Sequence, residues 1–205
     1  MATWFRSFSA VPGIGYKGNS DLYRPQIPEH ALLPKSGAYH IADTHRDYVS
    51  WPMLFGTGTT SASPVQQWST QPRDGERPAQ TRLRQIYEAL ELPGELLHYH
   101  FAIQGCCSEL WRLRREEPWV LVELEKLCWL DIRLMQAYPD IARANNEREF
   151  LVITTMQHLI TLYEQEGYLS EALQVAEIAM LFNQQKPALE RIKSRLAQLE
   201  AEEER

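Results

Sequence analysis

The chain has 205 residues, of which 44% are apolar and 23% charged, a composition typical of a soluble globular domain. It holds no run of 18 or more apolar residues, so we expect no membrane-spanning helix and no membrane partner. The net charge of −6 is uneven, because residues 1–78 carry +1 and residues 79–205 carry −7. An acidic helical region argues against nucleic acid as a partner.

The start of the chain and its cysteines indicate a location. Residues 1–6 lack a basic start followed by an apolar stretch, so we expect no secretory signal. Cys106, Cys107 and Cys128 are odd in number and have no framework spacing, which predicts reduced thiols and a cytoplasmic protein.

Residues 1–78 are predicted to form an irregular N-terminal arm. They contain eight of the twelve prolines and seven of the ten glycines, which disfavours long helices. They also contain ten aromatic residues, and disordered segments are usually poor in aromatics, so we expect the arm to lie on a helical body. Short strands are expected near Ala38–Ala42 and Tyr48–Phe55. The stretch Gly56–Gln71, rich in Ser, Thr and Gly, is predicted to be a mobile loop.

Residues 79–205 have the pattern of an α-helical domain, with apolar residues recurring at helical spacing between prolines and glycines. The first of six expected helices ends at Pro93. The next four run from Glu95 to Arg115, from Pro118 to just before Pro139, from Asn145 or Asn146 to Gly167, and from Leu169 to Asn183. The sixth begins at Pro187. Gly105 lies inside the second helix and predicts close approach of a neighbouring helix. The fold class is therefore mainly α, with about six helices in antiparallel hairpins.

One stretch has the pattern of a known repeat. Large and aromatic residues mark its first helix, a glycine marks its turn, and alanines mark its second helix; these are Met156, Leu159, Ile160, Tyr163, Gly167, Ala172, Ala176 and Ala179. The stretch, residues 153–186, resembles a single tetratricopeptide repeat. It departs from the family pattern at Met156, Ile160 and Gln184, where Trp, a small residue and Pro are usual. No second clean copy lies 34 residues earlier.

The resemblance implies a protein-binding groove lined by polar positions of the first repeat helix. In this chain those positions are Thr154, Gln157, His158, Thr161, Glu164 and Gln165. An ordinary solvated helix face is the alternative interpretation. Family members that grip a C-terminal carboxylate place Lys, Arg and Asn at such positions, and their absence here argues against that ligand.

Other motifs were weighed for chemistry. His40, Asp43 and His45 form the densest set of metal-ligand residue types, but they match no recognised metal signature. A turn of surface polar residues is the alternative for this cluster. The Gly13–Gly18 stretch fits G-x-G-x-x-G by letter, but prolines surround it, so we expect a loop and no bound cofactor. His100 and Cys107 share a helix face about 10 Å apart, too far for one metal ion.

The basic stretch Trp111–Arg115 is followed at once by Glu116 and Glu117, which favours a salt-bridged helix end over a nucleic-acid surface.

These observations lead to three hypotheses. The first is an adaptor that binds a peptide or a partner helix through the groove near Gln157 and Thr161, or holds its own N-terminal arm there. The second is a small metal-dependent or Cys/His enzyme that uses the cluster of His40, Asp43 and His45. The third is a structural subunit that assembles with other copies through an apolar seam along Leu189–Leu199. The sequence favours the first and argues against an enzyme.

Overall fold

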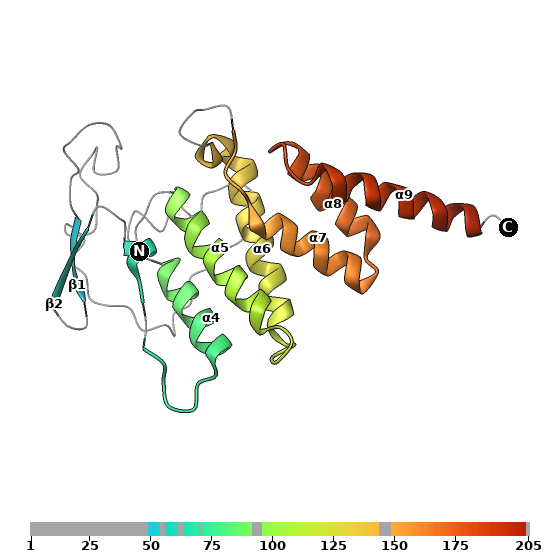
Figure 1. Cartoon of the computed structure of the whole chain (residues 1–205). Coiled ribbons are helices and arrows are strands. Elements are labelled where there is room, and N and C mark those ends of the chain that lie inside the picture. The colour runs from blue at the N-terminus through green and yellow to red at the C-terminus, as the bar shows by residue number, and fades with distance from the viewer. Residues whose placement is uncertain are drawn as a thin grey trace.

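The computed structural model describes residues 49–53, 56–60, 64–69, 71–91, 96–143 and 149–203. In this part of the chain six long helices follow one another, from α4 to α9 (Figure 1). Their bounds are Pro78–Ala89 for α4, Leu96–Leu113 for α5, Val120–Ala137 for α6, Thr154–Glu166 for α7, Leu169–Met180 for α8 and Lys186–Glu203 for α9. The prediction of a mainly α fold with packed helix pairs is confirmed. None of these helices is sufficiently long and apolar to cross a membrane.

The shorter elements lie at the start of this region and after α6. Strands β1, Val49–Met53, and β2, Gly56–Thr60, pair in antiparallel register with Trp51 opposite Gly58. The four-residue helix α3 spans Pro64–Gln67, and the 3-10 helix η1 spans Pro139–Ala142. The prediction of a loop over Gly56–Gln71 was therefore wrong, since β2 and α3 lie within it. The strand expected at Ala38–Ala42 lies outside the described residues, and the division at residue 78 stays a prediction.

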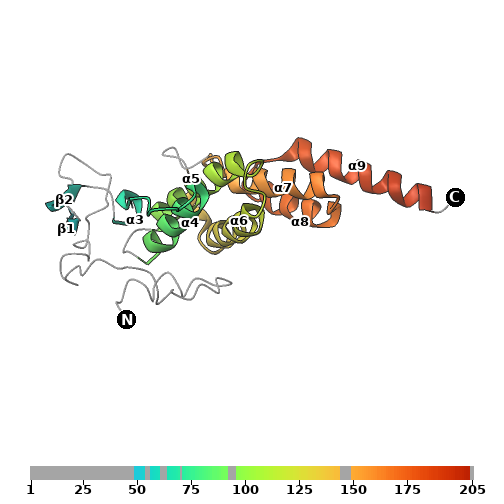
Figure 2. The ribbon, with the colours of Figure 1, turned by 90° about the horizontal axis from the view of Figure 1, so that it is seen from below.

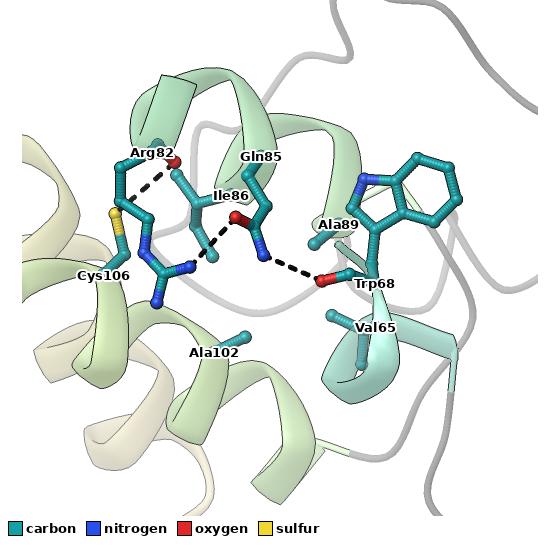
Figure 3. A pocket seen from close by; sticks show the side chains of 8 residues that line it. All are labelled: Val65, Trp68, Arg82, Gln85, Ile86, Ala89, Ala102 and Cys106. Atoms are coloured by element: carbon teal, nitrogen blue, oxygen red, sulfur yellow. Dashed lines mark hydrogen bonds between the residues drawn. The ribbon is translucent and has the colours of Figure 1, made fainter. Parts of the chain in front are cut away.

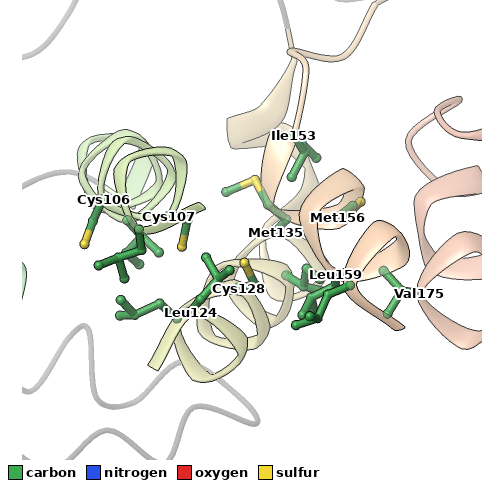
Figure 4. Packing of buried hydrophobic residues seen from close by; sticks show 14 of the residues in the cluster. Cys106, Cys107, Leu124, Cys128, Met135, Ile153, Met156, Leu159 and Val175 are labelled. Atoms are coloured by element: carbon green, nitrogen blue, oxygen red, sulfur yellow. The ribbon is translucent and has the colours of Figure 1, made fainter. Parts of the chain in front are cut away.

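The long helices form two layers. Helices α5, α7 and α9 lie in one row, and α4, α6 and α8 lie in the other (Figure 2). Each helix packs against the next in the chain, and α5 also packs against α7. Apolar residues between the rows form one continuous core, in which Cys107, Cys128 and Met156 are fully buried between α5, α6 and α7 (Figure 4). Three small side chains of the repeat, Ala172, Ala176 and Ala179, are buried on α8 in the same core.

Helix ends follow the residues that the sequence places there. Pro78 opens α4, where its missing N–H costs nothing, and the side chain of Gln80 accepts the N–H of Arg77. Gly167 ends α7 with φ of 84°, a left-handed conformation that glycine adopts without strain. The start of α7 was predicted wrongly. Instead of beginning at Asn145 or Asn146, which lie outside the described residues, the helix begins at Thr154, after Phe150 pairs with Arg143 in an isolated β-bridge.

Gly105 does not mediate close helix packing, so that prediction was also wrong. A methyl group at this position would meet no atom within 4 Å. Replacing Gly105 with Ala is therefore expected to raise the free energy of unfolding by about 0.5–1 kcal/mol, because alanine loses less backbone entropy in a helix. Urea unfolding followed by circular dichroism at 222 nm measures the change.

Gly167 provides the contrast. It has equal open space but a positive φ, so Gly167→Ala is expected to lower the free energy of unfolding by about 1 kcal/mol. A stabilising effect at both positions, or at neither, would contradict this assignment of their backbone roles.

Candidate functional site

A buried polar network joins α5, α6 and α7. Nδ1 of His100 lies 2.7 Å from Oδ1 of Asp131, and the hydroxyl of Thr155 donates to Oδ2 of the same carboxylate at 2.6 Å. All three side chains are fully buried. Because a carboxylate only accepts hydrogen bonds, Nδ1 of His100 is the donor. The network fixes which sides of α5 and α7 face α6.

The seam between α5 and α7 is held by side chains at both its ends. The side-chain oxygen of Gln104 accepts the backbone N–H of Thr154 at 2.9 Å. About two turns further along α5, the ring of Trp111 stacks on His158 with centroids 5.0 Å apart and an interplanar angle of 20°. The guanidinium of Arg114 lies 3.7 Å from the Trp111 ring centroid. These contacts set α5 and α7 side by side.

The two helices share a surface that points away from α6, which we call the α5–α7 outer face. On α5 it consists of Phe101, Gly105, Ser108 and Arg112, which recur every three or four residues and so lie on one side of the helix. On α7 it consists of Gln157 and Thr161. The fully buried side of α5 carries Ile103 and Leu110 and that of α7 carries Leu159, so the outer-face residues, on the opposite side of each helix, point away from the core.

The six residues predicted for partner binding separate into three groups. Gln157 and Gln165 are exposed, and half-buried Thr161 donates its hydroxyl hydrogen to the carbonyl of Gln157.

His158 and Thr154 lie at the seam with α5, and neither Nε2 of His158 nor Oγ1 of Thr154 has a hydrogen-bond partner in the part of the chain that the structure describes. At the other edge of α7, Glu164 forms a two-pronged ion pair with Arg191 of α9, with distances of 2.9 and 2.7 Å. The predicted residues therefore lie on the exposed side of α7 and at its contacts with α5 and α9.

Electrostatics at the α5–α7 seam are positive. Burial lowers the pKa of His158, and nearby Arg114 lowers it further. The pKa of Arg114 is itself lowered, first by burial and then by Arg115. Both shifts disfavour the charged forms, mainly because the groups are withdrawn from water and secondly because positive groups lie close together. The neutral form of His158 is therefore favoured at pH 7, and its ring stacks on Trp111.

The expected salt-bridged end to α5 is formed in part, because among the described residues the ion pair is made by Glu109 and not by Glu116 or Glu117. Arg112 lies 4.0 Å from Glu109, whose carboxylate contacts Arg82 at 2.7 Å. Glu117 is buried and accepts hydrogen bonds from Trp119 and from the backbone of Ala79. Arg114, in contrast, stacks on the ring of Trp111.

The other residues considered for chemistry are dispersed. Cys106 and Cys107 are buried, and His100 is fully enclosed with Asp131, so no exposed Cys–His pair forms on α5. Among the described residues no group of three or more His, Cys, Asp or Glu side chains could hold a metal ion. His40, Asp43 and His45 lie outside the described residues, as does the Gly13–Gly18 stretch.

The apolar seam of α9 serves the interior of this chain. Ile192 is fully buried, and Leu189 and Leu196 pack against the core. Leu199 is 45% exposed and lies near the end of α9. The C-terminal end of this helix extends past the other helices (Figure 1). Most of the seam expected for self-assembly is therefore used within the fold.

Helix α3 and Trp68 cover a different part of the helical body. Val65 is buried, the indole N–H of Trp68 donates to Glu88 at 3.0 Å, and Gln85 donates to the carbonyl of Trp68 at 2.9 Å. A cavity of about 60 Å³ remains between α3, α4 and α5, with the thiol of Cys106 on its wall (Figure 3). Part of the N-terminal segment thus packs against the α4 side of the helices.

Tyr163, expected to fill the space between the two repeat helices, also reaches α6. Its hydroxyl accepts the indole N–H of Trp129 at 2.9 Å and donates to the carboxylate of Glu125 at 2.5 Å. Burial, and then the hydrogen bond with Glu125, raise the pKa of Tyr163 to about 12. The hydroxyl therefore remains protonated at any physiological pH.

Sequence reasoning missed the contribution of α5 to the candidate site. Trp111, Arg112 and Arg114 were considered together as a basic patch, but their position beside His158 depends on how α5 packs. The only available signal was an aromatic residue with arginines at the end of one helix, together with a histidine at the margin of another. Comparisons with protein-family models, with curated proteins and with solved structures find no match to this chain.

Proposed function

We propose that the protein is an interaction module that binds a segment of a partner protein on the α5–α7 outer face. The observation that carries this proposal is the alternation of the helices between two rows, with α5, α7 and α9 in one row (Figure 2). In a repeat of the tetratricopeptide type, the first helix of each hairpin lines the surface that meets the ligand. Here α5 and α7 are the first helices of the α5/α6 and α7/α8 hairpins.

The side chains of this face support the proposal. The exposed Gln157 and half-buried Thr161 offer hydrogen-bonding groups without charge, and open space above Gly105 lets another backbone approach α5 closely.

The test is affinity capture with the full chain, followed by mass spectrometry. In a double variant, Gln157→Glu and Thr161→Glu, two long acidic side chains would stand one helical turn apart on α7. This change is expected to abolish capture of the partners that bind the wild-type protein, while thermal stability stays within a few degrees.

A matched control introduces the same two side chains on α8, in the other row of helices. Ser170 and Gln174 are exposed on α8, with the same spacing of four. The variant Ser170→Glu with Gln174→Glu is expected to retain every partner. Equal loss in both variants, or full retention in the α7 variant, would contradict the proposed face.

A further inference from the structure

Three arginines lie close together in sequence at the α5 end of the outer face. Arg112, Arg114 and Arg115 lie within four residues, and the side chain of Arg112 is 74% exposed. Arg115 is exposed and forms no ion pair in the described part of the chain. Glu116 is exposed beside them and also lacks an ion pair among the described residues. Arg112 pairs with Glu109 at 4.0 Å, but that carboxylate is shared with Arg82 at 2.7 Å, so Arg112 has a shared partner and Arg115 has none among the described residues.

The electrostatic environment of Arg114 leads to the same conclusion. Its pKa is lowered by burial and by Arg115, and no carboxylate offsets these two causes. Arg114 is held in place by stacking on Trp111, which in turn stacks on His158. A guanidinium that is already positioned loses little side-chain freedom when it pairs with an anion. The local field and the local geometry therefore both suit a negatively charged group.

We infer that the segment bound on the α5–α7 outer face is acidic, with Asp or Glu side chains placed against Arg112 and Arg115 beside the Trp111–His158 stack. This inference rests on the proposed function. Charge complementarity decides the occupant, because carboxylates pair with guanidinium groups through two parallel hydrogen bonds. A polypeptide fits better than nucleic acid, because a phosphate backbone carries a negative charge at every nucleotide against a protein of net charge −6, whereas a peptide can confine its carboxylates to the arginines.

The length of the face sets the spacing in the bound segment. Phe101 is 37% exposed on the same side of α5 as Arg112, eleven residues earlier. At 1.5 Å per residue the two positions are about 16 Å apart along the helix. An extended peptide covers that distance in about five residues. The segment therefore carries an apolar side chain for Phe101 about five residues from its acidic side chains.

The arginines also have a structural role to separate from binding. Cations near the C-terminal end of a helix stabilise it by roughly 0.3–1 kcal/mol each. The variant Arg112→Gln with Arg115→Gln is therefore compared with Arg73→Gln and Lys126→Gln, which removes two positive charges from exposed positions outside α5 and α7. Urea unfolding of each variant shows whether a change in binding reflects a change in folding.

The experiment selects ligands from a phage-displayed library of random 12-residue peptides, with the full-length protein as bait. Enriched peptides are labelled with fluorescein, and their affinity is measured by fluorescence anisotropy. We expect enrichment of Asp and Glu at a spacing of about five residues from an apolar residue. Replacing both arginines is expected to weaken binding by roughly tenfold, whereas the control variant and the wild type bind alike. Replacing Glu with Gln in the peptide should produce the same loss.

Each other outcome contradicts a distinct statement. One such outcome is a set of peptides without acidic enrichment whose binding is blocked by Gln157→Glu with Thr161→Glu but unchanged by Arg112→Gln with Arg115→Gln. That outcome would overturn the inference and leave the proposed function standing. Peptides that bind the α7 variant undiminished would overturn the proposed function itself. Failure to enrich any peptide would overturn the inference. So would a labelled 12-nucleotide single strand that displaces the peptide at equal concentration, because the arginines would then bind phosphates.

Discussion

Replacing Asp131 with Ala is expected to lower the free energy of unfolding by about 3–5 kcal/mol, the largest loss we expect from a single substitution in this protein. The carboxylate is fully buried and binds both His100 and Thr155. Its removal leaves two buried polar groups without a partner and a cavity where α5, α6 and α7 meet. Urea unfolding measured by circular dichroism and by tryptophan fluorescence determines the loss.

Two further variants identify the cause of that loss. Thr155→Val keeps the side-chain shape and removes one hydrogen bond, so a smaller cost of about 1–2 kcal/mol is expected. The double variant His100→Ala with Asp131→Ala is expected to lose less stability than the sum of the losses in the single variants His100→Ala and Asp131→Ala, because each substitution removes the same contact. A cost below 1 kcal/mol for Asp131→Ala, or additive costs in the double variant, would show that the network contributes little to the fold.

Much of the helical architecture could be predicted because proline, glycine and apolar spacing determine where helices begin and end. The end of α7 at Gly167, the start of α8 at Leu169 and the start of α9 beside Pro187 follow from local chemistry. Buried alanines on α8 likewise follow from a local pattern, since small side chains allow helices to pack closely. These features depend on residues that are close together in sequence, so a single sequence is enough to predict them.

The start of α7 depends on a contact that the sequence does not display. The side chain of Gln184 accepts the N–H of Ile153 at 3.0 Å and donates to the carbonyl of Leu151 at 2.8 Å. These bonds hold Leu151–Ile153 extended, although its apolar residues fit a helical pattern equally well. Gln184 had been noted only as a departure from the repeat pattern. The side chain of Gln184 in fact binds a segment more than thirty residues earlier in the sequence.

The candidate site divides in the same way. The α7 residues of the site could be predicted, because helical spacing separates Gln157 and Thr161 from the apolar side. The contribution of α5 could not be predicted, since the stack of Trp111 on His158 joins positions 47 residues apart in different hairpins. Asp131 gave one faint signal, as a charged residue among apolar neighbours on α6. Helix packing decides these contacts, and packing is a property of the whole fold.

Alkaline conditions are expected to destabilise the protein strongly through two buried thiols. Cys106 and Cys107 are at most 1% exposed. Burial raises the pKa of the Cys106 thiol, and burial followed by a hydrogen bond with Cys128 raises the pKa of the Cys107 thiol. In the unfolded chain a thiol has a pKa of about 8.5. Between that value and the folded value, the native state therefore binds more protons than the unfolded state.

The sign follows directly from this difference, because stability falls with pH wherever the folded state holds more protons. The contribution of each thiol is complete below about pH 8.5 and is lost as pH rises, by about 1.4 kcal/mol per pH unit. We expect the free energy of unfolding to fall by about 4 kcal/mol between pH 7.5 and pH 10 for the two thiols together. Urea unfolding in the presence of a reducing agent measures this slope.

The double variant Cys106→Ala with Cys107→Ala tests the cause. It is expected to be less stable at pH 7.5, because two buried side chains become smaller, but to lose much less stability up to pH 10. The comparison stops at pH 10, since Tyr163, whose pKa is raised to about 12, adds a slope of the same sign above that pH. A double variant with the slope of the wild type would mean that the thiolates of the unfolded chain do not drive alkaline unfolding. The cavities left by the smaller side chains lower the stability of the double variant equally at every pH. The difference in pH dependence between the wild type and the double variant therefore reports the thiols alone.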